Sequence, residues 1–159
     1  MKFCGIDPGI SGAFAIFDTT YEDEIQIWDM PTVSILRNGK NKNEVSAALV
    51  ATIIAGKNID CAYLERVNAM PGQGVSSVFS FGRSVGILEG VIAAYEIPIT
   101  IVTPQAWQKA MAVRGGKDGS RERAMELFPK SSDSFKLKKN DGRADATLIA
   151  MYGFQQQRK

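Results

Sequence analysis

Short apolar runs alternate with turn-rich breaks over the first part of the chain. Lys2–Ile6 and Ala13–Phe17 are apolar, and the break between them, Asp7-Pro-Gly-Ile-Ser-Gly, is of the kind that joins antiparallel strands. A third apolar run, Ile25–Met30, follows an acidic turn. The pattern predicts three strands in meander order.

Helical spacing begins further along the chain. Between Glu44 and Ala55 apolar residues recur at the spacing of one helix face, and Gly56 follows where a capping glycine is common. A long helix is predicted from about Val75 to Tyr95. Further helices are predicted near Pro104–Ala112, Ser120–Phe128 and Gly142–Phe154.

Two more strand-like runs separate these helices. Cys61–Leu64 ends at Glu65, and Ile99–Val102 follows the long helix. The order of elements predicts an α/β fold, with a mixed five-stranded sheet flanked by helices in a single domain, residues 1–159. The polar stretch Pro129–Asn140 is predicted to be a mobile loop.

The long helix carries a stripe of glycines. Gly82, Gly86 and Gly90 recur every four residues, although each costs a helix interior about 1 kcal/mol relative to alanine. Close approach of another backbone would offset this cost. We expect that backbone to be the sheet beneath, with a second subunit as the alternative.

Composition narrows the chemistry. The chain has no histidine, which excludes Ser-His-Asp triads and His-ligated zinc. Its two cysteines, Cys4 and Cys61, lie in apolar runs and are predicted to be reduced core residues. No apolar run approaches the ~20 residues of a membrane span, and no signal peptide is apparent, so we expect a soluble cytoplasmic protein.

Charge is unevenly distributed along the chain. Residues 1–104 carry 7 Lys/Arg against 11 Asp/Glu, whereas residues 105–143 carry 10 against 5. A basic segment beside an acidic body suits a protein that binds polyanions and keeps carboxylates in its site.

Four acids occupy the ends of predicted elements. Asp7 and Glu65 each end an apolar strand, while Asp141 and Asp145 lie four residues apart at the start of the last helix and are expected on one face of it. Each position has an ordinary structural explanation, since Asp141 is also a candidate N-cap. Together they predict a site for hard divalent cations such as Mg²⁺ or Mn²⁺, whose preferred ligands are oxygens. Two such ions about 4 Å apart can hydrolyse a phosphodiester.

The order of these acids resembles a known family. Asp7 in Gly-Ile-Asp-Pro-Gly-Ile-Ser-Gly, Glu65 after Ala-Tyr-Leu, and the Asp-Gly-Arg-Ala-Asp-Ala segment at 141–146 resemble the four acids of RuvC-type Holliday junction resolvases. Thr103-Pro104-Gln105-x-Trp107 and the lysine-rich run look more like bacteriophage-encoded members.

The resemblance implies an RNase H-like fold and a homodimer that cuts four-way DNA junctions. It assigns catalysis and metal binding to Asp7, Glu65, Asp141 and Asp145, with two Mg²⁺ ions per active site and Mn²⁺ as a substitute. The resemblance also implies a role in DNA recombination and repair. If the protein is phage-encoded, that role would be in the host cytoplasm.

The bacterial enzyme has an aromatic shortly after the strand-end glutamate, whereas Arg66–Met70 has none. Met70 or Phe79 is the candidate for that role, and strict preference for four-way junctions stays open. Basic residues are predicted to contact phosphates. They are Lys109, Arg114, Lys117, Lys136, Lys138, Lys139 and Arg143. Arg143 has the alternative of neutralising the aspartates beside it.

Three other functions share features with this sequence. The actin and sugar-kinase fold also uses an Asp-x-Gly-x-Ser hairpin but needs two lobes, for which 159 residues leave no room. A non-catalytic module that binds branched DNA would not need all four acids. A less selective RNase H-like nuclease acting on flaps, forks or RNA–DNA hybrids would share the chemistry and differ in substrate.

Overall fold

Five strands form the central sheet, in the order β3-β2-β1-β6-β7. Strand β1 pairs antiparallel with β2 and parallel with β6, and β7 is parallel to β6. The computed structural model describes residues 1–37, 39–69 and 71–158, without the side chain of Lys117. The strands are β1 (Lys2–Asp7), β2 (Ala13–Asp18), β3 (Ile25–Asp29), β6 (Cys61–Glu65) and β7 (Ile99–Val102). The predicted mixed five-stranded sheet is confirmed.

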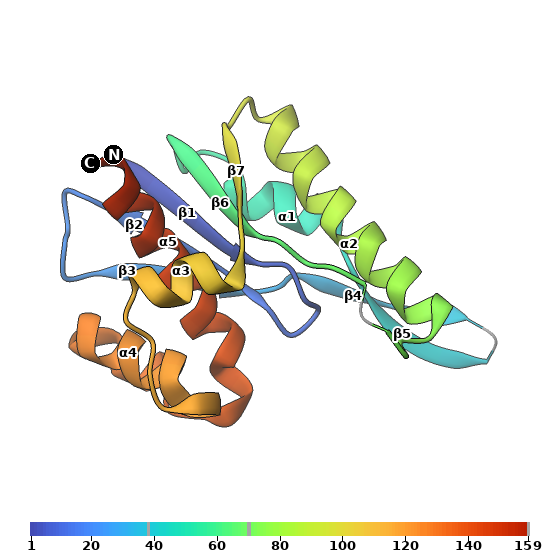
Figure 1. Ribbon diagram of the computed structural model, residues 1–159. Coiled ribbons are helices and arrows are strands. Elements are labelled where there is room, and N and C mark those ends of the chain that lie inside the picture. Colours follow the sequence, from blue (N-terminus) through green and yellow to red (C-terminus); the bar gives the residue numbers. More distant parts are fainter. Residues whose placement is uncertain (38, 70, 159) are drawn as a thin grey trace.

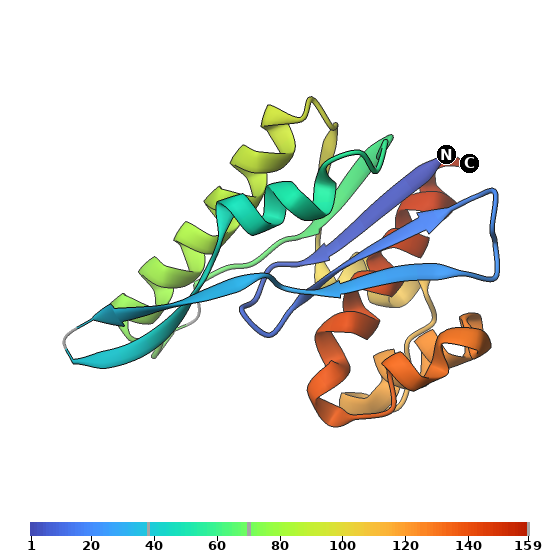
Figure 2. The ribbon, with the colours of Figure 1, turned by 180° about the vertical axis from the view of Figure 1, so that it is seen from behind.

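Helices cover both faces of this sheet (Figures 1 and 2). One face carries α1 (Ala47–Ile54) and α2 (Val75–Ala94), and the other carries α3 (Pro104–Ala110), α4 (Gly119–Leu127) and α5 (Asp141–Gln157). The two termini lie side by side in both views. The central sheet is therefore the middle one of three layers.

Alternation along β1 decides which side chains meet which helices. Phe3 belongs to the core beneath α5, whereas Cys4 and Ile6 belong to the core beneath α1 and α2. Because successive strand residues point to opposite faces, Gly5 and Asp7 lie on the α5 side with Phe3. The same period in β6 puts Glu65 on the face of Tyr63, also toward α5.

Helix α5 touches β1 with no side chain between the two backbones. A Cβ atom at Gly5 would lie 2.1 Å from the Ala146 carbonyl oxygen and 2.3 Å from the Ala150 nitrogen. Further along α5, a Cβ at Gly153 would lie 2.4 Å from the Tyr63 ring. These two glycines fix how deeply the helix sits on the sheet.

A hairpin that the sequence analysis did not predict extends from the sheet. Strands β4 (Thr32–Arg37) and β5 (Lys40–Val45) pair antiparallel, and Arg37 is opposite Lys40. The Asn-Gly pair at 38–39 is the strongest short-range sequence signal for such a turn. The predicted helix start at Glu44 is therefore wrong, because α1 begins at Ala47 with the Ser46 side chain as its cap.

The glycine stripe of α2 does not pack on the sheet. A Cβ atom at Gly82, Gly86 or Gly90 would meet no atom within 4 Å, so the predicted internal packing is wrong. Val75 and Phe79 on the same helix are 86% and 68% exposed. Contrary to the expectation from sequence, α2 is long and apolar enough to cross a membrane, by length and composition alone. An apolar, glycine-rich face of α2 is thus uncovered.

The segment predicted to be a mobile loop is folded. It forms two short 3₁₀ helices, η2 (Pro129–Ser134) and η3 (Lys138–Asn140). The Phe135 side chain between them is fully buried in the core beneath α5. A further 3₁₀ turn, η1 (Gly116–Asp118), precedes α4. The lysines of this segment are therefore held on an ordered surface beside the start of α5.

The contact at Gly5 gives a stability prediction. Gly5→Ala places a methyl group inside the backbone of α5, so we expect the free energy of unfolding to fall by roughly 3 kcal/mol. Gly90→Ala is the matched control, because its Cβ meets open space and alanine favours the helix by up to about 1 kcal/mol. Urea unfolding of both variants measures the difference. Equal stability of the two variants would contradict the close packing.

Candidate active site

Asp7 and Glu65 end neighbouring parallel strands. The register pairs Ile6 of β1 with Leu64 of β6, so the two acids come next on adjacent strands. Adjacent strands are about 4.8 Å apart. Both side chains point toward α5, which makes them neighbours at the carboxyl end of the sheet.

The start of α5 brings a third acid to the same place. A Cβ atom at Gly142 would lie 2.5 Å from the Ser11 carbonyl oxygen and 2.9 Å from Asp7 Oδ2. Glycine at this position therefore lets the first turn of α5 lie directly on the β1–β2 turn. One helical turn later, the Asp145 carboxylate is close enough to repel both Asp7 and Glu65 electrostatically.

Burial makes these acids unusual. It raises the pKa of Asp7 to about 6, with a further rise from the charge of Glu65, although the Gly9 N–H at 3.4 Å lowers it slightly. Burial likewise raises the pKa of Asp145 to about 6, opposed by a hydrogen bond from Ser120 and assisted by the charges of Asp7 and Asp141. The site thus holds negative charge that its surroundings do not neutralise.

Glu65 is oriented by a buried indole. Trp107 Nε1 donates a hydrogen bond of 2.6 Å to Glu65 Oε2, and the Trp107 side chain is completely buried. Burial raises the pKa of Glu65, the indole N–H lowers it, and the charge of Asp145 raises it again. Because the indole has no other polar atom, it fixes one carboxylate oxygen and leaves the other oxygen available to a ligand.

Asp141 is held apart from the other three acids. Its side chain is 56% exposed, and its Oδ1 lies 2.7 Å from Nε of Arg121. Arg121 also pairs with Asp118, and its Nη1 donates to the Lys136 carbonyl oxygen at 3.2 Å. Of the four predicted acids, the structure therefore brings three together, whereas the fourth forms an ion pair at the edge. Asn140, not Asp141, is the N-cap of α5.

The donor set suits a hard divalent cation. Asp7, Glu65 and Asp145 offer carboxylate oxygens, and their raised pKa values show that positive charge is missing from the site. Within residues 1–37, 39–69 and 71–158, no three acidic or cysteine side chains already surround one ion position. The chemistry of the residues fits the ion, because all three offer carboxylate oxygens.

Arg143 does not neutralise the aspartates beside it in sequence. Its Nε and one terminal nitrogen donate to the two Asp29 carboxylate oxygens at 2.5 and 2.7 Å. This pair lowers the pKa of Asp29. The alternative considered for Arg143 is therefore wrong. Arg143 and Lys139 line a pocket of about 300 Å³ with Ile10, next to the acids.

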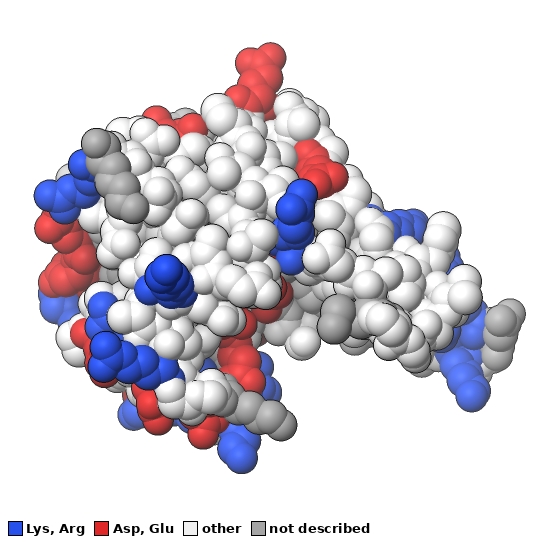
Figure 3. Space-filling model, viewed as in Figure 1, with Lys and Arg blue, Asp and Glu red and all other residues white. Residues whose placement is uncertain are grey.

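Figure 3 shows Lys and Arg side chains scattered over one face of the molecule, with no single basic patch on that face. Lys109, Arg114 and Lys138 are exposed, whereas Lys136 pairs with Asp133. Phe79 lies on the exposed face of α2. Met70 and the side chain of Lys117 lie outside the described residues. Figure 3 also shows cationic side chains on the β4–β5 hairpin, at the right of the view.

Sequence reasoning missed three residues of the site. No role in the site was predicted for Trp107, Ser120 or Arg121. Each supports an acid that is distant in sequence: Glu65, Asp145 and Asp141 respectively. Composition gave one usable signal, because a tryptophan in a short polar helix needs a polar partner for its indole N–H when it is buried.

Comparison with solved structures identifies the fold. RuvC of Thermus thermophilus in complex with a Holliday junction substrate matches with a TM-score of 0.68 at 13% identity, covering 99% of this chain and 95% of the other. This chain has the RuvC fold. The Holliday junction resolvase of fowlpox virus also matches, with a TM-score of 0.54 at 16% identity over 99% of both chains. The match to RuvC confirms the predicted RNase H-like fold.

One curated relative is similar in sequence to part of this chain. The Holliday junction resolvase MOC1, chloroplastic, of Chlamydomonas reinhardtii is 35% identical over 96 residues, 57% of this chain. The match covers 10% of that relative, so this chain spans a small part of its length. No protein-family model matches the sequence. The bacteriophage origin stays a prediction.

The buried acids predict an unusual pH dependence of stability in EDTA. A carboxyl group with a raised pKa binds its proton more tightly in the folded chain, so folding is favoured at low pH. We expect the free energy of unfolding to fall by roughly 2–4 kcal/mol between about pH 4 and pH 7, as Asp7 and Asp145 ionise. Chemical denaturation across this pH range measures the fall.

Two variants separate this effect from a general response to pH. Asp7→Asn removes one ionising group and is expected to be more stable than the unsubstituted chain at pH 7.5, by about 2 kcal/mol, but not at pH 4. Asp29→Asn is the control, because Arg143 lowers the Asp29 pKa and its loss destabilises the fold instead. Stability that rises from pH 4 to pH 7 and is unaffected by Asp7→Asn would contradict the assignment.

Proposed function

We propose that this chain is a structure-selective endonuclease that cuts four-way and related branched DNA. The observation that carries the proposal is the group of three partly buried carboxylates at the ends of β1 and β6 and the start of α5. Buried acids that repel one another are costly unless a cation or a substrate uses them. Two similar proteins, MOC1 and the fowlpox virus enzyme, are named Holliday junction resolvases.

Asp7, Glu65 and Asp145 would hold the divalent cation, and Mg²⁺ is the ion that we propose, with two ions per site. When bound, such ions supply a Lewis acid that activates water and offsets charge on a phosphodiester. Asp141 would become a further ligand of the cation after its ion pair with Arg121 breaks. The proposal thus gives the four acids unequal roles, with Asp141 as the most replaceable.

The chain's own residues orient the ligands and the substrate. The Trp107 indole holds Glu65 in place, and Ser120 does the same for Asp145. Lys139 lies beside the β1–β2 turn that carries Asp7 and is exposed to solvent. A lysine at this position would bind a backbone phosphate next to the scissile bond without reading base sequence.

Cleavage of labelled DNA tests the proposed function. The substrates are a four-way junction, a fork, a flap, a plain duplex and an RNA–DNA hybrid, each with Mg²⁺, Mn²⁺ or EDTA. We expect metal-dependent paired nicks near the branch point of the junction. Cutting mainly of hybrids would instead indicate a ribonuclease H, and no cutting of any substrate would contradict the nuclease proposal.

Single substitutions assign the chemistry. Asp7→Asn is expected to lower the cleavage rate by at least about 10³-fold while junction binding persists, because it removes a ligand that touches the reacting centre. Asp141→Asn is expected to lower it less, because Asp141 is exposed and already paired. Asp133→Asn is the control, since its partner is Lys136 on the surface. Equal losses for Asp7→Asn and Asp133→Asn would refute the assignment.

We also propose that the chain works as a homodimer through the exposed face of α2. The open stripe of Gly82, Gly86 and Gly90 allows a second helix to approach closely, and Val75 and Phe79 add apolar area. Two active sites in one dimer would suit the paired strands of a junction. We also propose a cytoplasmic location. The two free cysteines, Cys4 and Cys61, support it, because thiols stay reduced in that compartment.

Gly86→Arg tests the dimer. A Cβ atom at Gly86 meets no atom of its own chain within 4 Å, so folding should be unchanged, whereas the dimer dissociation constant should rise at least tenfold. Sedimentation of both forms measures the constant. Tyr21→Arg is the control on a different exposed surface. A monomeric unsubstituted chain, or a Gly86→Arg variant that dimerises normally, would contradict the proposal.

A further inference from the structure

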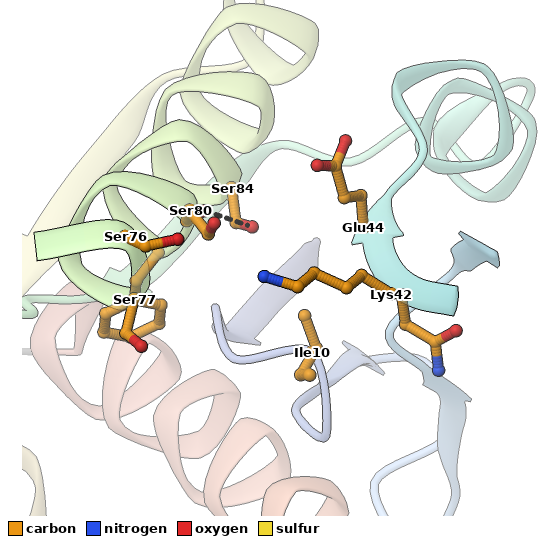
Figure 4. A pocket seen from close by; sticks show the side chains of 9 residues that line it. Ile10, Lys42, Glu44, Ser76, Ser77, Ser80 and Ser84 are labelled. Carbon is orange, nitrogen blue, oxygen red and sulfur yellow. Dashed lines mark hydrogen bonds between the residues drawn. The ribbon is translucent and has the colours of Figure 1, made fainter. Parts of the chain in front are cut away.

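A second pocket, distinct from that of Lys139 and Arg143, shares Ile10 of the β1–β2 turn with it. Its volume is about 460 Å³, and it opens between the first turns of α2 and strand β5, with Ile10 of the β1–β2 turn at its base (Figure 4). Lys42 extends from β5 across this pocket toward a row of serines on α2. The serines are Ser76, Ser77, Ser80 and Ser84.

The acid in the pocket is already neutralised. Glu44 Oε1 lies 3.1 Å from Arg37, and Glu44 Oε2 pairs with Arg83. Lys42 has no ionic partner among the residues that the structure describes. Because two arginines balance Glu44, the ammonium of Lys42 gives the pocket an excess of positive charge.

The serine row supplies hydrogen-bond donors. The Ser84 hydroxyl is buried and donates to the Ser80 carbonyl oxygen at 3.0 Å. In the described part of the chain, no side-chain hydrogen bond occupies the hydroxyls of Ser76, Ser77 and Ser80. Unused hydroxyls facing an unpaired ammonium are a donor set for the oxygens of a phosphate.

Position links this pocket to the acids. Ile10 lines both this pocket and the pocket of Lys139 and Arg143, so two cation-bearing hollows adjoin one turn. Ile10 is three residues from Asp7, which limits their Cα separation to about 11 Å. One DNA strand advances about 3.4 Å per nucleotide along the helix axis, so a strand bound at the acids would reach this pocket within a few nucleotides.

We propose that the pocket of Lys42 and the α2 serines binds a backbone phosphate of the DNA strand, about two to four nucleotides from the bond that is cut. The inference rests on the proposed nuclease function and adds a binding site to it. DNA is favoured over a free phosphate because Lys42 belongs to the β4–β5 hairpin, which also carries the exposed residues Arg37 and Lys40. The β4–β5 hairpin then serves as an arm that follows the substrate backbone.

Junction affinity as a function of salt provides the first test, measured in EDTA so that no strand is cut. Lys42→Ala should weaken binding about five- to tenfold and reduce the slope of log affinity against log salt by about 1. Lys42→Arg should retain most of the affinity. Lys57→Ala is the matched control, because the Lys57 side chain lies over the Trp28 ring and does not line the pocket.

Neutral phosphates locate the contact. The cut is first mapped with Mg²⁺, and single methylphosphonates are then placed one to five nucleotides on either side of it. One position, two to four nucleotides away, should weaken binding of the unsubstituted chain but not weaken Lys42→Ala further. Ser76→Ala combined with Ser80→Ala should show the same loss of sensitivity at that position.

The outcomes separate the two proposals. Junctions that are cut normally and bound equally by the unsubstituted chain and Lys42→Ala would overturn this inference and leave the nuclease intact. Additive losses for Lys42→Ala and every methylphosphonate would also overturn it, because Lys42 would then act only through its general charge. Inorganic phosphate that competes with the junction at millimolar concentration, with no sensitive position, would reassign the pocket to a free anion. An unsubstituted chain that neither binds nor cuts junctions would refute the proposed function itself.

Discussion

The contact of α5 with β1 at Gly5 is the constraint on which the rest of the structure depends. No side chain separates the two backbones there, so the helix is placed to within a fraction of an ångström along and above the strand. Gly142 repeats this close approach over the β1–β2 turn. Because Asp145 is one turn beyond Gly142 and Asp7 is two residues beyond Gly5, fixing the helix also fixes the distance between these acids.

The proximity of these acids is a destabilising feature that the fold tolerates. Burial raises the pKa values of Asp7 and Asp145 to about 6, and neither acid has an arginine or lysine partner within the described residues. The nearby arginines pair elsewhere: Arg121 with Asp118 and Asp141, and Arg143 with Asp29. The chain thus places its own cations around the rim and leaves the centre negative, as a site for a divalent ion requires.

Period-two and helical patterns explain how much could be predicted from sequence. The central strands are buried on both faces, so their apolar runs were found, and acids at the ends of such runs identified Asp7 and Glu65. The two strands of the projecting hairpin were missed. Strand β5, Lys40–Val45, is polar and mostly exposed, so it has no apolar pattern that would indicate a strand. The Asn-Gly turn was the remaining signal for that hairpin.

Interactions between distant segments were beyond sequence reasoning. The spacing of Asp141 and Asp145 predicted one shared helix face, but it carried no information that Arg121 on α4 would hold one of the two at the rim. The indole that orients Glu65 lies 42 residues away. Likewise, the glycines of α2 indicated that another backbone packs closely against this helix, but the sequence did not show which one. In the structure no part of the described chain covers the glycine face of α2.

The most direct measurement is the position of Mn²⁺, by anomalous scattering, in crystals of this protein grown with that ion. The account predicts an anomalous peak coordinated by Asp7, Glu65 and Asp145, with Trp107 still bonded to the second Glu65 oxygen. A peak elsewhere, or no peak at these three carboxylates at saturating Mn²⁺, would contradict the claim that they form the catalytic metal site.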